Sequence, residues 1–371
     1  MIVMSNKIAK QLYYGDKNII KAFAGNKMVY ADPDVVLWRN KCTPWAIANG
    51  KLYGETEEMS ASSDWVDAGL RKDGTAYVGS LYNLVEIDNG GYWKEVQGDL
   101  LLSKDGEIYA SYTPPTVKHI DTSDVYHAPW ETFVSHRLIK DSDGGYYFYP
   151  GETSVSVVPI TLPYEHTEIN WVGRASLYSS APYIYMAGGN LFTITYDYNT
   201  HTANFKEFGN LNDGKWSKFF ANSVGLHDGE LMSIEYEDTT EHAPTIIPLK
   251  DSEYGSGIYP DVPDNTRWVS VAGNNPALRI GSTSSDDGSL FAVNEQGELW
   301  CISNSYGSFF RPVTAKFPGN NWHAVIAGYS IDYGYIYPNY TYAITAYGEI
   351  YYVSNSTGVF GDVEFDVVKL G

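Results

Sequence analysis

The sequence has few cysteines, few basic residues and no long apolar segment, and each of these absences excludes a class of protein. Its 371 residues include two cysteines, Cys42 and Cys301, which are too few for a disulfide framework. We expect two buried free thiols, with a bridge between them as the alternative. No apolar stretch is long enough to span a bilayer, and residues 1–10 hold no apolar run of signal length. We therefore expect a soluble protein that is made in a cytoplasm.

Positive charge is scarce and unevenly distributed. The chain has 25 lysines and arginines against 45 acidic residues, a net charge of −20. Because a nucleic-acid ligand requires a basic face, we expect no nucleic-acid binding, and we expect no membrane insertion either. Residues 1–31 contain five lysines and one aspartate, a net charge of +4, which leaves −24 for the remainder. A basic leader on an acidic body indicates two functions in one chain.

Catalytic and metal-binding motifs are also missing. The eight histidines are scattered without zinc-site spacing, and there is no Gly-x-Ser-x-Gly elbow or Walker loop. Residues 141–144, Asp-Ser-Asp-Gly, are similar to the start of a calcium loop, and Glu152 stands twelfth, but Tyr146 occupies the sixth place, where that loop needs glycine. We interpret this segment as a hairpin turn. We expect no enzyme activity, no cofactor and no metal, and the alternative is a glycosidase with carboxylates brought together from distant segments.

What the sequence does contain is a degenerate repeat of a tryptophan-led strand, a glycine turn and an aromatic strand. Trp93-Lys94-Glu95-Val96, followed by Asp105-Gly106-Glu107-Ile108-Tyr109, is one example. Seven tryptophans begin such units: Trp65, Trp93, Trp130, Trp171, Trp216, Trp268 and Trp322. Their glycine turns lie at Gly74, Gly106, Gly144, Gly189, Gly229, Gly297 and Gly348. No sustained helical periodicity is present, and a unit of about 48 residues fits a four-stranded propeller blade.

We therefore predict an all-β fold, a seven-bladed β-propeller over residues 33–371 preceded by a small N-terminal β-hairpin module. Residues 35–57 form a partial unit, which we interpret as closing the ring together with the C-terminal strands, with an eighth blade as the alternative. The units at Trp268 and Trp322 resemble the regulator-of-chromosome-condensation repeat family, whose members form seven-bladed propellers. The resemblance implies the fold. It does not imply that family's exchange activity on a small GTPase, because no residue set here matches it.

Residues 1–31 hold a short repeat of their own. Gly15-Asp16-Lys17 and Gly25-Asn26-Lys27 lie between strand-prone runs and predict two hairpin turns joining three short strands. Three such strands cannot bury enough surface to be stable alone, so they must pack on something else. Residues 14–30 resemble a leader at the N-termini of many bacteriophage structural proteins, where it is similar to an attachment module for a distal domain. A hairpin cap on the propeller is the alternative.

The resemblance implies that residues 1–31 contact other virion proteins. The residues expected to make this attachment are Tyr14, Gly15, Asp16, Lys17, Phe23, Gly25, Asn26 and Lys27.

Residues 329–342, in an expanded part of the last unit, contain six tyrosines. Tyr333, Tyr335 and Tyr337 alternate, so in an extended strand they share one face. A tyrosine has a flat apolar ring with a polar tip, which suits sugar stacking and protein contacts. We predict a binding surface here, and the alternative is a strand pair packed between blades. The predicted binding residues are Tyr329, Tyr333, Tyr335, Tyr337 and Tyr340.

Together these features indicate a phage virion protein, associated with the tail, whose propeller is displayed for adhesion to a host-surface saccharide or protein. One alternative is an architectural component (a spacer, tail part or capsid decoration) that binds other virion proteins. The other is a propeller enzyme. We expect synthesis in the host bacterial cytoplasm and oligomeric assembly in the virion. The insertions of the late units, at residues 274–287 and 329–340, predict which rim of the propeller binds.

Overall fold

The computed structural model consists of antiparallel strands and, in the part of the chain it describes, a single 3-10 turn, η1 (Leu249–Asp251). The described residues are 13–14, 17–18, 21–24, 27–31, 46–48, 51–54, 57–58, 65–67, 69–80, 83–87, 92–125, 129–134, 137–150, 157–161, 169–174, 183–197, 199–220, 224–235, 245–251, 265–273, 289–305, 311–317, 319, 321–332, 335–347, 349–357 and 363–370. Within these ranges no helix is long and apolar enough to cross a membrane.

Seven four-stranded sheets, here blades 1 to 7, follow one another along the chain, each with its strands paired in sequence order. Blades 1 to 3 comprise β8 (Trp65–Asp67), β9 (Leu70–Arg71), β10 (Ala76–Ser80), β11 (Asn83–Ile87); β12 (Trp93–Gln97), β13 (Leu100–Ser103), β14 (Ile108–Thr113), β15 (Thr116–His119); and β16 (Trp130–Phe133), β17 (Leu138–Asp141), β18 (Tyr146–Phe148), β19 (Val158–Ile160). Blades 4 and 5 comprise β20 (Ile169–Arg174), β21 (Tyr183–Ala187), β22 (Asn190–Asp197), β23 (Thr202–Glu207); and β24 (Trp216–Phe220), β25 (Val224–His227), β26 (Glu230–Glu235), β27 (Thr245–Pro248). Blades 6 and 7 comprise β28 (Trp268–Gly273), β29 (Ser289–Asn294), β30 (Leu299–Ser305), β31 (Arg311–Lys316); and β32 (Trp322–Asp332), β33 (Tyr335–Thr345), β34 (Ile350–Thr357), β35 (Val363–Lys369).

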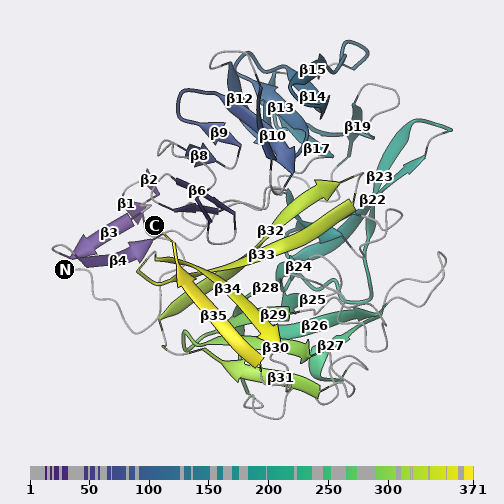
Figure 1. The fold of residues 1–371 in the computed structure, drawn as a ribbon. Helices are drawn as coiled ribbons and strands as arrows, with labels where there is room; N and C mark the ends of the chain where they lie inside the picture. The colour runs from purple at the N-terminus through teal and green to yellow at the C-terminus, as the bar shows by residue number, and fades with distance from the viewer. Residues whose placement is uncertain are drawn as a thin grey trace.

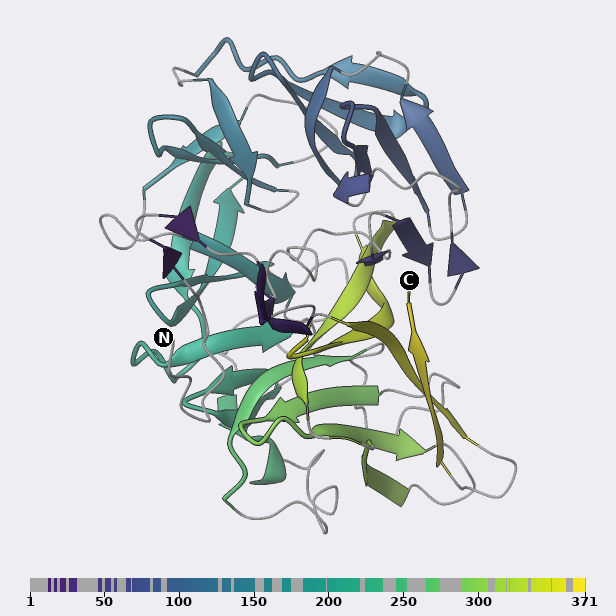
Figure 2. The same ribbon diagram turned by 90° about the vertical axis from the view of Figure 1, so that its left-hand side faces the viewer.

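These sheets are arranged around a ring, as Figures 1 and 2 show from two directions. The predicted fold class, an all-β propeller with seven blades, is confirmed. The Trp-led strands line the inside of the ring, because β12 contacts β16, β24 contacts β28, and β28 contacts β32.

A β-bulge directly follows the tryptophan in all seven blades, for example between Trp93 and Glu95. A bulge bends its strand and increases the local twist, which helps each innermost strand to turn into its blade.

In four blades the tryptophan packs against a tyrosine of the third strand of the same blade, namely in the pairs Trp65–Tyr77, Trp93–Tyr109, Trp130–Tyr147 and Trp322–Tyr351. The ring centroids of Trp93 and Tyr109 are 5.3 Å apart, and those of Trp130 and Tyr147 are 4.9 Å apart. Both indoles are buried. Aromatic pairs at these distances add to the burial free energy, so the repeated Trp and Tyr positions form part of the core of these blades.

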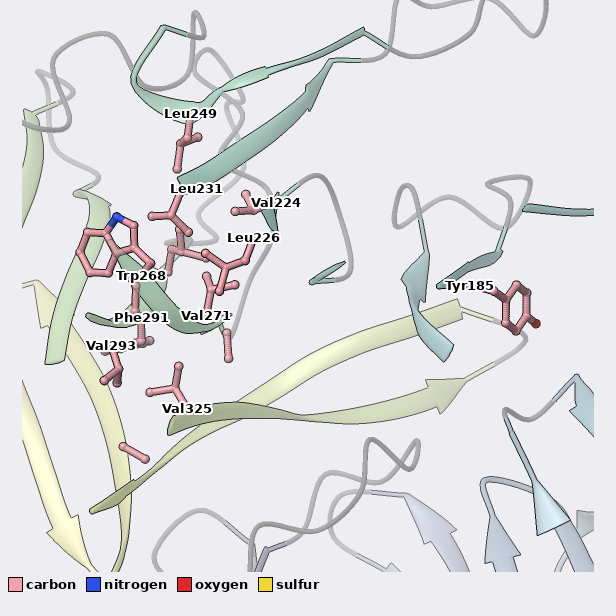
Figure 3. Packing of buried hydrophobic residues seen from close by; sticks show 14 of the residues in the cluster. Tyr185, Val224, Leu226, Leu231, Leu249, Trp268, Val271, Phe291, Val293 and Val325 are labelled. Atoms are coloured by element: carbon pink, nitrogen blue, oxygen red, sulfur yellow. The ribbon is translucent and has the colours of Figure 1, made fainter. Parts of the chain in front are cut away.

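The largest hydrophobic cluster runs between adjacent blades, as Figure 3 shows. Leu226 and Leu231 of blade 5 face Trp268 and Phe291 of blade 6, and Val325 of blade 7 belongs to the same cluster. Because each sheet covers the face of the next, no blade has a complete core by itself.

The ends of the ring meet at a three-stranded sheet of β5 (Ala46–Ala48), β6 (Lys51–Gly54) and β7 (Glu57–Glu58). On one side Tyr53 packs with Tyr342 and Leu370 of blade 7, and on the other Leu52 packs with Trp65 of blade 1. Side-chain packing therefore joins this sheet to both neighbours. The predicted closure of the ring by residues 35–57 with the C-terminal strands stays a prediction, because residues 35–45 lie outside the described residues and β5 to β7 form a sheet separate from that of blade 7.

The N-terminal segment forms two hairpins, β1 (Tyr13–Tyr14) with β2 (Lys17–Asn18), and β3 (Lys21–Ala24) with β4 (Lys27–Ala31). Tyr14 pairs with Lys17 and Ala24 with Lys27, so both predicted hairpins are confirmed. The predicted number of three strands is wrong, since β2 and β3 belong to separate sheets. Each turn has its own flanking pair of strands, so the run between the turns supplies two strands.

Three outermost strands contain a proline, namely Pro159, Pro248 and Pro312. A proline at a sheet edge lacks a backbone donor, which discourages another strand from pairing there. These parts of the outer wall therefore resist strand addition.

Candidate functional site

The turns between the second and third strands of the blades lie on one face of the ring, here called the turn face. At five joints the backbone N–H of a blade's tryptophan donates to the carbonyl oxygen of the turn glycine in the preceding blade. The N–O distances are 3.2 Å for Trp93 to Gly74, 3.2 Å for Trp130 to Gly106, 3.0 Å for Trp216 to Gly189, 2.7 Å for Trp268 to Gly229 and 3.0 Å for Trp322 to Gly297. The two residue types that mark the repeat in the sequence are therefore bonded to each other across the joints.

A positive φ favours glycine at these turns, and at some of them glycine is also required for space. Gly189 has a φ of +75°, and a Cβ added there would lie 2.1 Å from the carbonyl oxygen of Gly214. Gly144 has a φ of +88°, but a Cβ there would meet nothing within 4 Å. The close approach of one blade to the next therefore differs between joints.

The segment that is similar to a calcium loop is a hairpin turn. One carboxylate oxygen of Asp141 accepts hydrogen bonds from the backbone N–H groups of Asp143 and Gly145, at 3.1 and 2.6 Å. The other oxygen accepts one from the Tyr147 hydroxyl at 3.2 Å. Asn294 caps the matching turn of blade 6 in the same way. Glu152 lies outside the described residues, among which no three His, Cys, Asp or Glu groups could hold a metal ion.

Charged side chains join the blades on the turn face. Arg267, directly before Trp268, lies 2.9 Å from Asp228 of blade 5 and 3.6 Å from Glu295 of its own blade. At the joint between blades 4 and 5, Asp213 lies 2.6 Å from the Nε2 atom of His227 and 3.0 Å from the Nζ atom of Lys215. These two partners, His227 first, lower the pKa of Asp213 to about 2.

The predicted tyrosine surface lies on the hairpin formed by β32 and β33, the two longest strands of the described chain. Tyr329 is opposite Pro338, Tyr337 is opposite Ser330, and Tyr335 is opposite Asp332. β33 pairs with β34 from Thr341 onward, so residues 329–340 extend beyond the four-stranded part of the blade. Tyr340 lies in β33, and Tyr333 lies outside the described residues. The shared face of these tyrosines stays a prediction.

This hairpin also contacts its neighbours. β32 contacts β28 and β29 of blade 6 and reaches β10 of blade 1, past the three-stranded sheet at the join. β33 contacts β28 as well. Packing between blades therefore accounts for part of the hairpin. For residues 329–340, which extend beyond the four-stranded sheet, binding stays a prediction.

The N-terminal hairpins, which carry the predicted attachment residues, lie apart from the blades. In Figure 1, β1 to β4 lie at the left edge, whereas β32 and β33 cross the middle of the molecule. Tyr14, Lys17, Phe23 and Lys27 lie in these strands. The turn residues predicted with them, Gly15, Asp16, Gly25 and Asn26, lie outside the described residues.

Cys301 is a free, buried thiol, as predicted, and burial raises its pKa. Nucleophilic chemistry needs the thiolate, which a raised pKa disfavours, so this residue has a packing role. Cys42 lies outside the described residues.

Sequence reasoning missed an aromatic cluster on the turn face of blade 2. Tyr109 packs edge-to-face against Tyr92 at 6.3 Å and against His119 at 5.1 Å, measured between ring centroids. The Nε2 atom of His119 lies 3.0 Å from a carboxylate oxygen of Glu107. A hydrogen bond with Tyr92 is the main cause that raises the pKa of Tyr109 to about 12. The available signal was Tyr92, an aromatic residue directly before a repeat tryptophan.

Comparisons with known proteins give the fold alone. No protein-family model matches the sequence, and no curated protein sequence matches it. Among solved structures, the yeast RCC1 protein Prp20 of Saccharomyces cerevisiae is similar over 92% of this chain and 88% of its own, with 11% identity and a TM-score of 0.42. A periplasmic gluconolactonase of Pseudomonas aeruginosa matches over 90% and 95%, with 9% identity and a TM-score of 0.38. The WD40 domain of fission-yeast SCAP matches over 73% and 71%, with 9% identity and a TM-score of 0.36.

At these identities and scores the likeness carries no argument about activity or ligands. The propeller is established by the seven sheets and their order around the ring.

Proposed function

We propose that this chain is a structural protein of a bacteriophage particle, associated with the tail, whose propeller adheres to a saccharide or protein on the host surface. Residues 1–31 attach the chain to other virion proteins. The observation that carries the proposal is the pair of N-terminal hairpins, with pairings at Tyr14–Lys17 and Ala24–Lys27, in a segment that resembles phage attachment leaders.

The separation of these hairpins from the propeller supports an attachment role. β1 pairs with β2 and β3 with β4, and neither pair belongs to a propeller sheet. An isolated two-stranded hairpin is marginally stable in water, so such a segment gains stability from a partner. Its net charge of +4, on a body of −24, favours an acidic docking surface.

The hairpin of β32 and β33 supports adhesion, because its residues 329–340 extend beyond the four-stranded part of blade 7. Tyrosine-rich segments supply contact area at a low cost in conformational entropy.

An architectural role is the second candidate. It is favoured by the contacts of β32 with blade 6 and blade 1, which give the hairpin a place in the ring itself. In that case the propeller is a rigid spacer or decoration, and its partners are virion proteins.

Immunogold electron microscopy, with antibody to residues 33–371, tests the proposal on particles from the source culture. Gold at the tail tip or fibres is the expected result. Gold on the capsid or along the tail shaft would favour the architectural role. Particles without any gold would overturn the assignment to a virion.

Removing residues 1–32 tests the attachment. The truncated chain should fold, with the strand signal of the propeller in circular dichroism, and should be missing from purified particles. Incorporation of the truncated chain at the level of the full chain would show that attachment lies elsewhere.

A further inference from the structure

In a repeat protein, a residue that the blade architecture needs should recur from blade to blade, and one that does not recur is free for another role. The position directly before the repeat tryptophan allows this comparison. Its backbone carbonyl accepts a hydrogen bond from the turn of the same blade, at 3.0 Å from Lys104 to Tyr92 and 2.9 Å from Ser142 to Pro129. At this position the backbone makes the recurring contact, so the side chain is free to vary. The other blades carry Asp64, Pro129, Asn170, Lys215, Arg267 and Asn321 here.

A second position gives the same contrast. Across the third and fourth strands, His119 is opposite Tyr109, whereas Pro159 is opposite Tyr147 and Lys369 is opposite Tyr351. Blade 2 therefore carries a ring at both variable positions, next to the tyrosine that the repeat places in the third strand. The architecture does not explain this gathering of rings.

The cluster lies at the surface. The side chains of His119 and Glu107 are 47% and 49% exposed, and Tyr92 and Tyr109 are half-buried. Trp93 beneath them is buried and in edge-to-face contact with both tyrosines, at 5.3 Å in each case. The rings are thus held in place from below, while polar groups at their edge face solvent.

We propose that Tyr92, Tyr109, His119 and Glu107 form a saccharide-binding site on the turn face of blade 2. This inference rests on the proposed adhesive function, and it adds a second binding site to the tyrosine hairpin. The rings offer apolar surface to the C–H face of a pyranose. Glu107 accepts hydrogen bonds from sugar hydroxyls, and His119 donates a hydrogen bond to them or accepts one.

The charges of the site define the class of sugar. Glu107 and the neighbouring Asp105 are acidic, and they would repel the carboxylate of a uronic or sialic acid. The site is therefore expected to take a neutral pyranose.

Ligand-observed saturation-transfer NMR on the full chain tests the proposal. The probes are the methyl glycosides of glucose, galactose, mannose and N-acetylglucosamine. We expect transfer to at least one of them. The double variant Tyr92→Asn with His119→Lys gives blade 2 the residues that blade 7 carries at Asn321 and Lys369, so it should fold normally. Its affinity for the same glycoside should fall at least tenfold.

A matched control separates this site from the hairpin. The variant Tyr335→Ala with Tyr337→Ala should keep the transfer to the monosaccharide. Absence of transfer to all four glycosides, or transfer that the blade 2 variant leaves unchanged, would overturn this site. Gold at the tail tip in the same material would then leave the adhesive function standing.

Discussion

The two faces of the propeller differ in what their residues do. On the turn face, the same backbone hydrogen bond, from a tryptophan N–H to a turn glycine, recurs at five joints. The first two strands of each blade, which are joined on the opposite face, vary in length from two residues in β9 to eleven in β32 and β33. One face is constrained because it joins the blades, and the other can gain insertions without disturbing a joint.

This difference teaches where function can be added to a repeat fold. On the constrained face, new chemistry has to use side chains whose backbone is held by the recurring hydrogen bonds, as that of Tyr92 is in blade 2. On the variable face, it can use whole hairpins, as in β32 and β33.

The largest expected effect comes from removing a tryptophan from the constrained face. Trp130 is buried and packs on Tyr147. Trp130→Ala should lower the free energy of unfolding by about 3–5 kcal/mol, measured by urea denaturation. Val269→Ala is the control: this side chain is 37% exposed, and its loss should change stability by less than about 0.5 kcal/mol. Equal effects of the two changes would contradict the assigned core.

A pair of glycine changes tests the joints themselves. Gly189→Ala adds a Cβ that overlaps the Gly214 carbonyl, so the loss should be about 3 kcal/mol. Gly144→Ala meets no neighbour and should cost about 1 kcal/mol, from its positive φ alone. If the two variants unfold at the same urea concentration, the contact between blades 4 and 5 does not have the geometry described.

On the variable face, changes should affect binding more than stability. Tyr335→Ala with Tyr337→Ala should weaken binding to host cells, while the melting temperature stays within about 2 °C of the wild type. Cell binding is measured with labelled protein, and melting by circular dichroism. A drop of more than about 5 °C would show that these rings belong to the core of the ring closure.

The smallest effect concerns acid. Because His227 and Lys215 hold the pKa of Asp213 at about 2, below its usual value of 3.8, this carboxylate stabilises the fold above about pH 4. That stabilisation is lost as the pH falls toward 2. The stability advantage of the wild type over Asp213→Asn should therefore shrink between pH 5 and pH 2. Because Asp213 and Lys215 are exposed, 1 M salt should reduce it at pH 5 as well.

Much of the fold could be predicted because the residues that define it are close together in the sequence. The seven tryptophans and the glycine turns define the units, and the two N-terminal turns are each set by two residues between paired strands. The calcium-like segment was also correctly interpreted as a turn, since glycine is missing where the loop needs it. The number of N-terminal strands was wrong, because strand breaks between two turns leave no clear mark in composition.

The sequence by itself determined the repeat, its all-β character and the charge contrast between residues 1–31 and the propeller. Tertiary structure alone decided how the blades are joined, how β5 to β7 fill the gap between the ends of the ring, and which rings meet at Tyr109. The physical reason is that a backbone N–H or carbonyl is the same in every residue. Its partner in another blade is chosen by the geometry of the closed ring, and residues as distant in sequence as Tyr92 and His119 both meet Tyr109 only when the strands of blade 2 have paired.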